Sequence, residues 1–202
     1  MMKKILCILV SLVLLSCLSG CGKEAEKTPS APNTEKYGIH HAVITVKDFG
    51  EIKVELDGDT APITVENFIT LAKSGFYNGL TFHRIIKGFM IQGGDPEGNG
   101  MGGSEKTIKG EFMQNGVENT ISHTRGVISM ARRSGDNNSA SSQFFIMHAD
   151  DPSLDGAYAA FGHVTEGMEV VDQIAEQTPV TDRNGTVAKA NQPVITSVTI
   201  TD

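Results

Sequence analysis

The stretch 82–95 constrains the fold of this chain most, because it holds two apolar runs of strand length on either side of a Lys87-Gly88 turn. That pattern predicts an antiparallel hairpin. Side chains alternate between the two faces of a strand, so we expect Phe82, Arg84 and Ile86 to share one face of the first strand. The sequence therefore predicts a sheet protein whose central hairpin carries polar groups on one face.

Each run of the hairpin contains one polar residue that a core strand would not need. Arg84 stands in the first run, and Gln92 shares a face with Met90 in the second. A buried guanidinium without a partner is very costly, so this mixture favours the wall of a pocket over a core. The alternative is an ordinary hairpin whose Arg84 extends its charged head into solvent.

The rest of the globular region shows short strands and two helices. We expect one amphipathic helix from about Pro62, capped by Asp59 or Thr60 and ended by Gly75. A second helix is expected over 168–175. Short strands at close spacing with only two helices favour an antiparallel barrel or sandwich. The other predicted strands lie within 41–57, where they form a hairpin, and at 127–131, 143–148, 159–165 and 194–200.

The composition is that of one acidic domain with an unusual N-terminus. With 202 residues and 39% hydrophobic content, the chain can bury one sizeable core. The formal net charge of -7 leaves no basic stripe, which argues against nucleic-acid binding. The three cysteines, Cys7, Cys17 and Cys21, all lie near the N-terminus. None is therefore available to cross-link the globular region.

Residues 1–20 have the pattern of a secretory signal peptide. Lys3 and Lys4 precede an apolar run, 5–18, that is shorter than the roughly 20 residues needed to span a bilayer. The following Cys21 completes an ending, Leu-Ser-Gly-Cys, that resembles the lipobox of bacterial lipoproteins. The resemblance implies that Cys21 becomes the first mature residue and carries lipid. We therefore expect a protein that is lipid-anchored to the cell membrane on its extracytoplasmic face.

Residues 21–38 are predicted to form the lipidated N-terminus and a flexible tether, because they contain almost nothing apolar. The adjacent His40 and His41 suggest a metal pair, but a strand would point them to opposite faces, so we expect no metal. Gly98, Gly100 and Gly103 match the spacing of a dinucleotide fingerprint. Pro96 and Glu97 precede them where a strand should end, and no apolar helix follows, so a surface loop is expected.

Taken together, the motifs resemble those of the cyclophilin family of peptidyl-prolyl isomerases, with the domain running over 39–202. The motifs that carry the resemblance are Phe-His-Arg within 76–86, Gly-Phe-Met with Gln-Gly-Gly-Asp over 88–95, the segments 126–131 and 142–146, and Leu-Asp-Gly with Phe-Gly over 154–162. The resemblance implies a mainly β fold, a closed eight-stranded antiparallel barrel capped by two helices. It also implies an active groove on the outer face of the barrel.

The resemblance places the catalytic arginine on Arg84. Arg132 stands where many members have asparagine, Tyr158 where they have histidine, and Ser153 where they have tryptophan. Because that tryptophan helps to bind cyclosporin in the family, Ser153 implies weaker inhibition by this drug. The substrate-binding residues that the resemblance implies are Phe89, Met90, Gln92, Ala131, Arg132, Gln143, Phe145, Leu154 and Tyr158.

The expected function is therefore isomerisation of Xaa-Pro bonds in exported proteins to assist their folding, by a monomer that needs no cofactor. The partners implied are proline-containing peptides and unfolded exported proteins. One alternative is a hydrolase that uses His83 with a serine such as Ser129, Ser142 or Ser153, although none has a nucleophile-elbow sequence. The other is a membrane-tethered peptide-binding chaperone module with little turnover.

Overall fold

The computed structural model describes residues 37–202 of the chain. The predicted signal peptide, Cys21 and nearly all of the predicted tether lie outside the described residues. Within 37–202, no helix combines the length and the apolar character that a membrane span requires.

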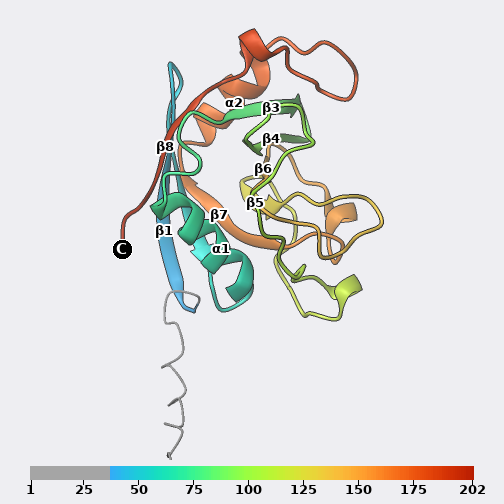
Figure 1. Ribbon diagram of the computed structural model, residues 1–202. Coiled ribbons are helices and arrows are strands. Elements are labelled where there is room, and N and C mark those ends of the chain that lie inside the picture. The colour runs from blue at the N-terminus through green and yellow to red at the C-terminus, as the bar shows by residue number, and fades with distance from the viewer. Residues whose placement is uncertain (1–36) are drawn as a thin grey trace, which may run out of the picture. The chain divides into compact units, whose positions relative to one another are not determined.

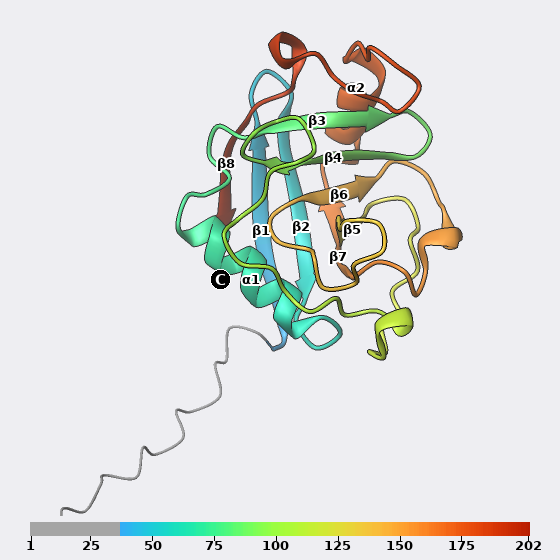
Figure 2. The same cartoon turned by 45° about the vertical axis from the view of Figure 1, so that its right-hand side comes forward.

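The domain is built on one curled sheet of eight antiparallel strands (Figures 1 and 2). Their order across the sheet is β3-β4-β6-β5-β7-β2-β1-β8. The predicted strands are confirmed, including both hairpins, because alternating and apolar runs pair as their periodicity requires. The strands are β1 (Ile39–Val46), β2 (Gly50–Asp57), β3 (Thr81–Ile86), β4 (Met90–Asp95), β5 (Val127–Met130), β6 (Phe144–Met147), β7 (Ala160–Glu166) and β8 (Ile195–Ile200).

The two edge strands of the sheet, β3 and β8, do not pair along their length. A single antiparallel bridge joins Thr81 to Val194. The irregular segment 184–187 covers another part of the β3 edge, where the Ile85 N–H donates to the Gly185 carbonyl at 2.8 Å. The expected closure of the barrel is therefore not confirmed. The sheet is an open half-barrel, and an irregular segment satisfies much of the edge that a closing strand would occupy.

Two helices lie at opposite ends of the curled sheet (Figure 2). Helix α1 (Pro62–Lys73) contacts β8 and β2, and helix α2 (Met168–Gln177) contacts β2 and β4. Both were expected from their apolar periodicity. Among residues 37–202, three single-turn 3-10 helices lie in the connections, η2 (Met113–Asn115), η3 (Pro152–Leu154) and η4 (Lys189–Asn191).

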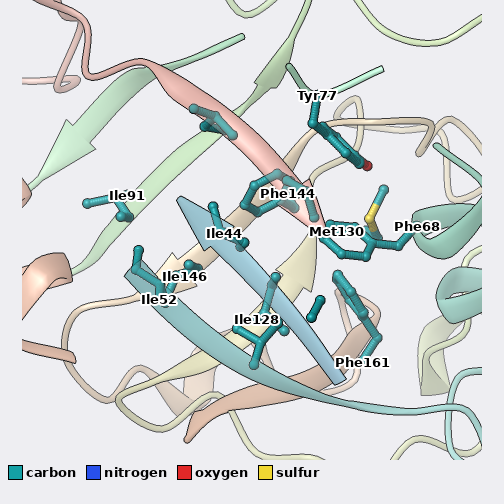
Figure 3. Packing of buried hydrophobic residues seen from close by; sticks show 14 of the residues in the cluster. Ile44, Ile52, Phe68, Tyr77, Ile91, Ile128, Met130, Phe144, Ile146 and Phe161 are labelled. Carbon is teal, nitrogen blue, oxygen red and sulfur yellow. The ribbon is translucent and has the colours of Figure 1, made fainter. Parts of the chain in front are cut away.

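The main core fills the inside of the curl, between the sheet and α1 (Figure 3). Phe68 of α1 is fully buried at its centre. Its ring centroid lies 5.1 Å from that of Tyr77, 5.6 Å from that of Phe144 and 5.4 Å from that of Phe161. Tilted and edge-on contacts of this kind add to the stabilisation from buried apolar area. Aromatic packing thus fixes α1 on the sheet.

The N-terminus of α1 is capped from far along the sequence, and the expected local cap is wrong. Neither Asp59 nor Thr60 is the cap residue, and no side chain at the cap position bonds to the helix. Instead the buried Glu111 carboxylate accepts hydrogen bonds from the backbone N–H groups of Ile63 and Thr64, at 3.0 and 2.8 Å. A carboxylate here also complements the positive end of the helix dipole.

We predict that Glu111→Gln lowers the free energy of unfolding by about 1–3 kcal/mol, because a neutral amide offers only one acceptor oxygen to the helix N–H groups. Urea denaturation monitored by circular dichroism would measure the change. Glu118→Gln is the matched control, since Glu118 is exposed, and it should change stability by less than about 0.5 kcal/mol. Equal effects of the two substitutions would contradict a capping role for Glu111.

Candidate functional site

Arg84 reaches the outer face of the sheet because β3 contains a bulge. In the pairing of β3 with β4, Phe82 lies opposite Gly93 and Arg84 lies opposite Gln92, so His83 is the extra residue. Phe82 therefore packs in the main core, and the prediction that it shares a face with Arg84 is wrong. A bulge adds one residue to one strand and so reverses the alternation beyond it.

The residues opposite one another across four strands form a row on this outer face. Arg84 pairs with Gln92, Gln92 with Phe145, and Phe145 with Ser129. Directly opposed residues in antiparallel strands have side chains on the same face. We call Arg84, Gln92, Phe145 and Ser129 the cross-strand row. Because it joins β3, β4, β6 and β5, the sheet itself sets the spacing of the site.

A second apolar cluster covers this face beside the row. Met90 and Phe145 belong to this cluster, while their chain neighbours Ile91 and Phe144 face the main core. Strand alternation therefore lets the same two strands serve both faces. Partly buried side chains from three loops pack on the cluster, namely Phe89, Ala131, Leu154 and Tyr158.

These side chains enclose a cavity of about 200 Å³, which we call the apolar cavity. All but one of the residues predicted for catalysis and substrate binding line it, and the exception is Gln143. The sequence prediction thus identified residues from β3, β4, β6 and three loops that the fold brings together. The lining residues are Arg84, Phe89, Met90, Gln92, Ala131, Arg132, Phe145, Leu154 and Tyr158.

The Arg84 guanidinium is held at the edge of the apolar cavity by hydrogen bonds to Asn184 and Gln92 and by a 3.8 Å contact with Met90 Sδ. Its Nε donates to the Asn184 carbonyl at 2.9 Å, and one terminal nitrogen donates to Gln92 Oε1 at 3.1 Å. Partial burial lowers the pKa of Arg84, while Tyr158 and Asp182 act in the opposite direction. The group stays a donor at neutral pH, because a guanidinium does not deprotonate in proteins.

Gln92 and Gln143 connect the apolar cavity to a larger one of about 570 Å³, which we call the polar cavity. Gln92 Nε2 donates to Gln143 Oε1 at 2.9 Å. Gln143 Nε2 donates in turn to the carbonyls of Gly100 and Gly102, at 3.1 and 2.7 Å. The two cavities share Gln92, Ala131 and Arg132 and so form one groove. Gln143 lies on the polar side of that groove.

Ala131 and Gln143 are also bonded to each other through the backbone. The Ala131 N–H donates to the Gln143 carbonyl at 2.9 Å. That N–H is therefore engaged within the protein, and any pairing of Ala131 with a peptide in the groove must use its carbonyl.

A serine, a histidine and an aspartate meet behind Phe145, but not the histidine that the hydrolase alternative assumed. His123 lies 2.8 Å through Nδ1 from Asp155 Oδ1 and 3.0 Å through Nε2 from Ser129 Oγ. Because a carboxylate only accepts, Nδ1 carries the proton and Nε2 accepts from the serine hydroxyl. Ser129 is 0% exposed and the His123 side chain 1%. No substrate can reach this serine, so the hydrolase alternative has no support.

This triad, in which Ser129 and His123 are buried and Asp155 reaches the surface, supports the wall of the apolar cavity. The His123 ring stacks on Phe145 with centroids 6.0 Å apart and planes inclined by 18°. Asp155 directly follows Leu154, another wall residue, and also accepts from the Ser122 hydroxyl at 2.6 Å. The triad thus holds two wall residues in place from the side opposite the cavity.

His83, the bulge residue, has a different environment. It is 4% exposed, and neither ring nitrogen has a hydrogen-bond partner in the part of the chain that the structure describes. Burial lowers the pKa of His83; the charge of Asp95 opposes this effect and that of Arg84 adds to it. His83 is therefore kept neutral and is no candidate for acid–base chemistry at the groove.

Sequence reasoning missed the loop that holds Arg84. Asn184 and Gly185 approach β3 closely, and Gly185 has φ +81° with the Ile85 carbonyl only 2.2 Å from where a Cβ would stand. Only glycine fits there. An Asp182-Arg183-Asn184-Gly185 sequence does indicate a turn. Nothing in it indicates that the turn lies against a strand about 100 residues earlier in the chain.

His40 has partners within the protein on both of its ring nitrogens. His40 Nδ1 lies 3.2 Å from Asp202 Oδ2, and its Nε2 lies 3.0 Å from the Tyr37 carbonyl. Over residues 37–202, no group of three or more His, Cys, Asp or Glu side chains has an arrangement that could hold a metal ion. The glycine-rich stretch around Gly98 and Gly100 forms a loop after β4, as expected.

Comparison with known proteins shows the family of this chain. The family model "Cyclophilin type peptidyl-prolyl cis-trans isomerase/CLD" matches residues 41–201. The chain belongs to the cyclophilin family. It is therefore an enzyme of the peptidyl-prolyl cis-trans isomerase type.

Individual relatives support the assignment. A peptidyl-prolyl cis-trans isomerase of Helicobacter pylori is 47% identical over 138 residues, which are 67% of this chain and 82% of that protein. A peptidyl-prolyl cis-trans isomerase-like 2 of Rhizopus delemar is 46% identical over 140 residues, or 69% of this chain but 25% of that longer protein. A cyclophilin of Cryptosporidium parvum, solved in the presence of the dipeptide Ala-Pro, gives a TM-score of 0.71 at 32% identity. The match covers 80% of this chain and 99% of that structure.

The buried His123 predicts that this cyclophilin loses stability in mild acid. Burial lowers the pKa of His123, although the hydrogen bond and charge of Asp155 oppose that effect. Below about pH 6.5 the unfolded chain therefore binds a proton at this position that the folded chain does not. The neutral His123 therefore contributes its full stabilisation above that pH. As the pH decreases below it, the free energy of unfolding falls by up to about 1.4 kcal/mol per pH unit for one such histidine.

Urea unfolding of the parent and of His123→Asn between pH 7 and pH 5 measures this effect. The variant should be less stable at pH 7 and should show a shallower decline toward pH 5. His163→Asn is the control, because it removes an imidazole that is exposed. Parallel declines in the parent and in His123→Asn would contradict the assignment.

Proposed function

We propose that this cyclophilin isomerises Xaa-Pro bonds of exported proteins outside the cytoplasm, with Arg84 as the group that stabilises the twisted amide. The single observation that carries the mechanism is the position of Arg84. Its guanidinium is fixed at the edge of an apolar cavity while hydrogen bonds to Asn184 and Gln92 use only part of its donor capacity.

The reaction needs a donor and not a nucleophile. Rotation about a peptide bond costs about 18–20 kcal/mol, because resonance between nitrogen and carbonyl is lost at the twisted state. The two isomers of an Xaa-Pro bond differ by only about 1 kcal/mol, yet they exchange over tens of seconds or longer. In the twisted state the prolyl nitrogen regains its lone pair and becomes a hydrogen-bond acceptor. A fixed N–H donor that meets this nitrogen stabilises the transition state selectively.

Arg84 can supply part of the transition-state stabilisation, and the cavity supplies the rest. A hundred-thousandfold acceleration requires roughly 7 kcal/mol. One preorganised donor supplies about 3 kcal/mol, by analogy with oxyanion sites. A proline ring seated against Phe89, Met90 and Phe145 stays fixed while the preceding carbonyl rotates, and the apolar wall excludes water from the bond. Phe89, Met90 and Phe145 give the 200 Å³ cavity apolar walls against which a pyrrolidine ring can pack.

We predict that Arg84→Ala lowers kcat/KM for a short Xaa-Pro peptide about a hundredfold, because the loss of one such donor costs about 3 kcal/mol. Isomerisation assays on the full chain would measure this, with circular dichroism as the test of folding. Arg183→Ala is the matched control, because Arg183 is exposed and lines neither cavity. A folded Arg84→Ala variant with parental activity would overturn the assignment.

A second candidate function is a peptide-binding chaperone module with little turnover. The polar cavity favours it, because its volume of about 570 Å³ exceeds what the proline ring requires and it continues the groove. The same assay separates the two functions. A folded parent that binds Xaa-Pro peptides but does not accelerate their exchange would put the binding module first.

The extracytoplasmic location rests on the sequence of the first 38 residues. The signal pattern of residues 1–20, the Leu-Ser-Gly-Cys ending and the polar stretch that follows Cys21 support a lipid-anchored enzyme on a tether. A tethered isomerase would meet exported chains as they emerge from the membrane, and this is the basis for proposing them as substrates.

We expect the full chain, produced in a bacterium, to incorporate labelled palmitate and to fractionate with membranes. Cys21→Ser should abolish incorporation, because the thiol is the attachment point that the proposal requires. Cys17→Ser is the matched control and should keep the label, since Cys17 lies within the apolar run that would be removed. Label that survives in Cys21→Ser would exclude this anchor.

A further inference from the structure

Arg132 lies where the two cavities of the groove meet, and its guanidinium is fixed by its own surroundings. Arg132 follows β5 in the chain, and Tyr158 precedes β7, the strand that pairs with β5. Arg132 Nε donates to the Ala157 carbonyl at 3.0 Å, and a terminal nitrogen donates to the Arg133 carbonyl at 3.2 Å. These bonds hold the guanidinium at the groove even though Arg132 is only partly buried.

The guanidinium contacts two aromatic rings. Its central carbon lies 4.9 Å from the centroid of Tyr158 and 5.3 Å from that of Phe112. Phe112 is 1% exposed and belongs to the main core, so it cannot move freely. A cation over an aromatic face is attracted by the ring quadrupole. Arg132 thereby connects Tyr158, a loop residue, to the rigid part of the domain.

Tyr158 in turn contacts the apolar cavity. Its ring lies edge-on to Phe145, with centroids 5.8 Å apart and planes at 86°. Both residues line the cavity. The contacts therefore run from Phe112 through Arg132 and Tyr158 to Phe145, which belongs to the cross-strand row.

We propose that Arg132 is a positioning residue that fixes the Tyr158 ring as one wall of the apolar cavity, and thereby sets the affinity of the cavity for a proline ring. This inference rests on the proposed function of the cavity. Without the guanidinium, the ring gains freedom that each binding event must remove again, so binding weakens. The bond rotation itself is not affected, because Arg132 acts through Tyr158.

Lysine cannot replace Arg132 in this role. The guanidinium is planar, so its edge donates to two carbonyls while its face lies on the rings. A lysine ammonium is a compact charge that cannot do both at once. We therefore expect Arg132→Lys to behave more like Arg132→Ala than like the parent.

The first experiment compares the full-length parent, Arg132→Ala, Arg132→Lys, Tyr158→Ala and the Arg132→Ala/Tyr158→Ala double variant in an Xaa-Pro isomerisation assay. Arg132→Ala should raise KM roughly 3- to 10-fold, with kcat within about twofold of the parent. If Arg132 acts on binding through Tyr158, the double variant should be no weaker than Tyr158→Ala alone, although Arg132 itself also lines the cavity. Effects that multiply, or a loss confined to kcat, would overturn the proposal.

A second readout separates failure of this inference from failure of the proposed function. The chain has three tyrosines and no tryptophan, so NMR of ring-labelled tyrosine resolves Tyr158 directly. In Arg132→Ala the ring signals of Tyr158 should shift and should average over several ring orientations. The affinity for the dipeptide Ala-Pro should fall by the same factor as KM rises. Arg183→Ala should change neither. If the parent binds Ala-Pro but shows no turnover, the proposed function fails, while the Tyr158 signal and the Ala-Pro affinity still test the role of Arg132. A Tyr158 signal that does not change in Arg132→Ala overturns the inference.

Discussion

The pairing of β3, β4, β6 and β5 is the constraint on which the functional groove depends. Antiparallel pairing places Arg84, Gln92, Phe145 and Ser129 opposite one another on a single face. The hydrogen-bonding distance between strands then sets the spacing between the donor, the amide and the aromatic wall. The spacing of the cross-strand row does not depend on loop conformation, because the sheet that carries the main core fixes it.

The polar groups of the groove are satisfied in two separate ways. On the cavity side, Arg84, Gln92 and Gln143 bond to one another in sequence and to loop carbonyls. On the opposite side of Phe145, the buried His123 joins the buried Ser129 to Asp155, whose carboxylate reaches the surface. A buried polar group without a partner costs a large part of a domain's stability, so such networks need to be complete. Their completeness keeps the cavity preorganised for its substrate.

Local patterns predicted much of the fold because they involve neighbours in the chain. Alternation identified the strands, and a 3.6-residue period identified both helices. The prediction failed where a distant partner decided the outcome. Glu111 caps α1 in place of Asp59 or Thr60 because tertiary structure brings its carboxylate to the helix end. The bulge at His83 places Phe82 on the face opposite to that of Arg84. The segment 184–187 bonds to the β3 edge that a closing strand would occupy, so the half-barrel stays open.

The sequence by itself determined which residues belong to the groove, since motifs shared with the cyclophilins mark Arg84 and the apolar side chains around it. It also showed Arg132 and Tyr158 as departures from the family pattern, but as two unrelated ones. Only the tertiary structure places them in contact, with a guanidinium carbon 4.9 Å from the ring centroid. The physical reason is that they stand 26 positions apart, at the paired ends of β5 and β7. Periodicity reports which face a residue takes, whereas contact depends on which strands pair and in what register.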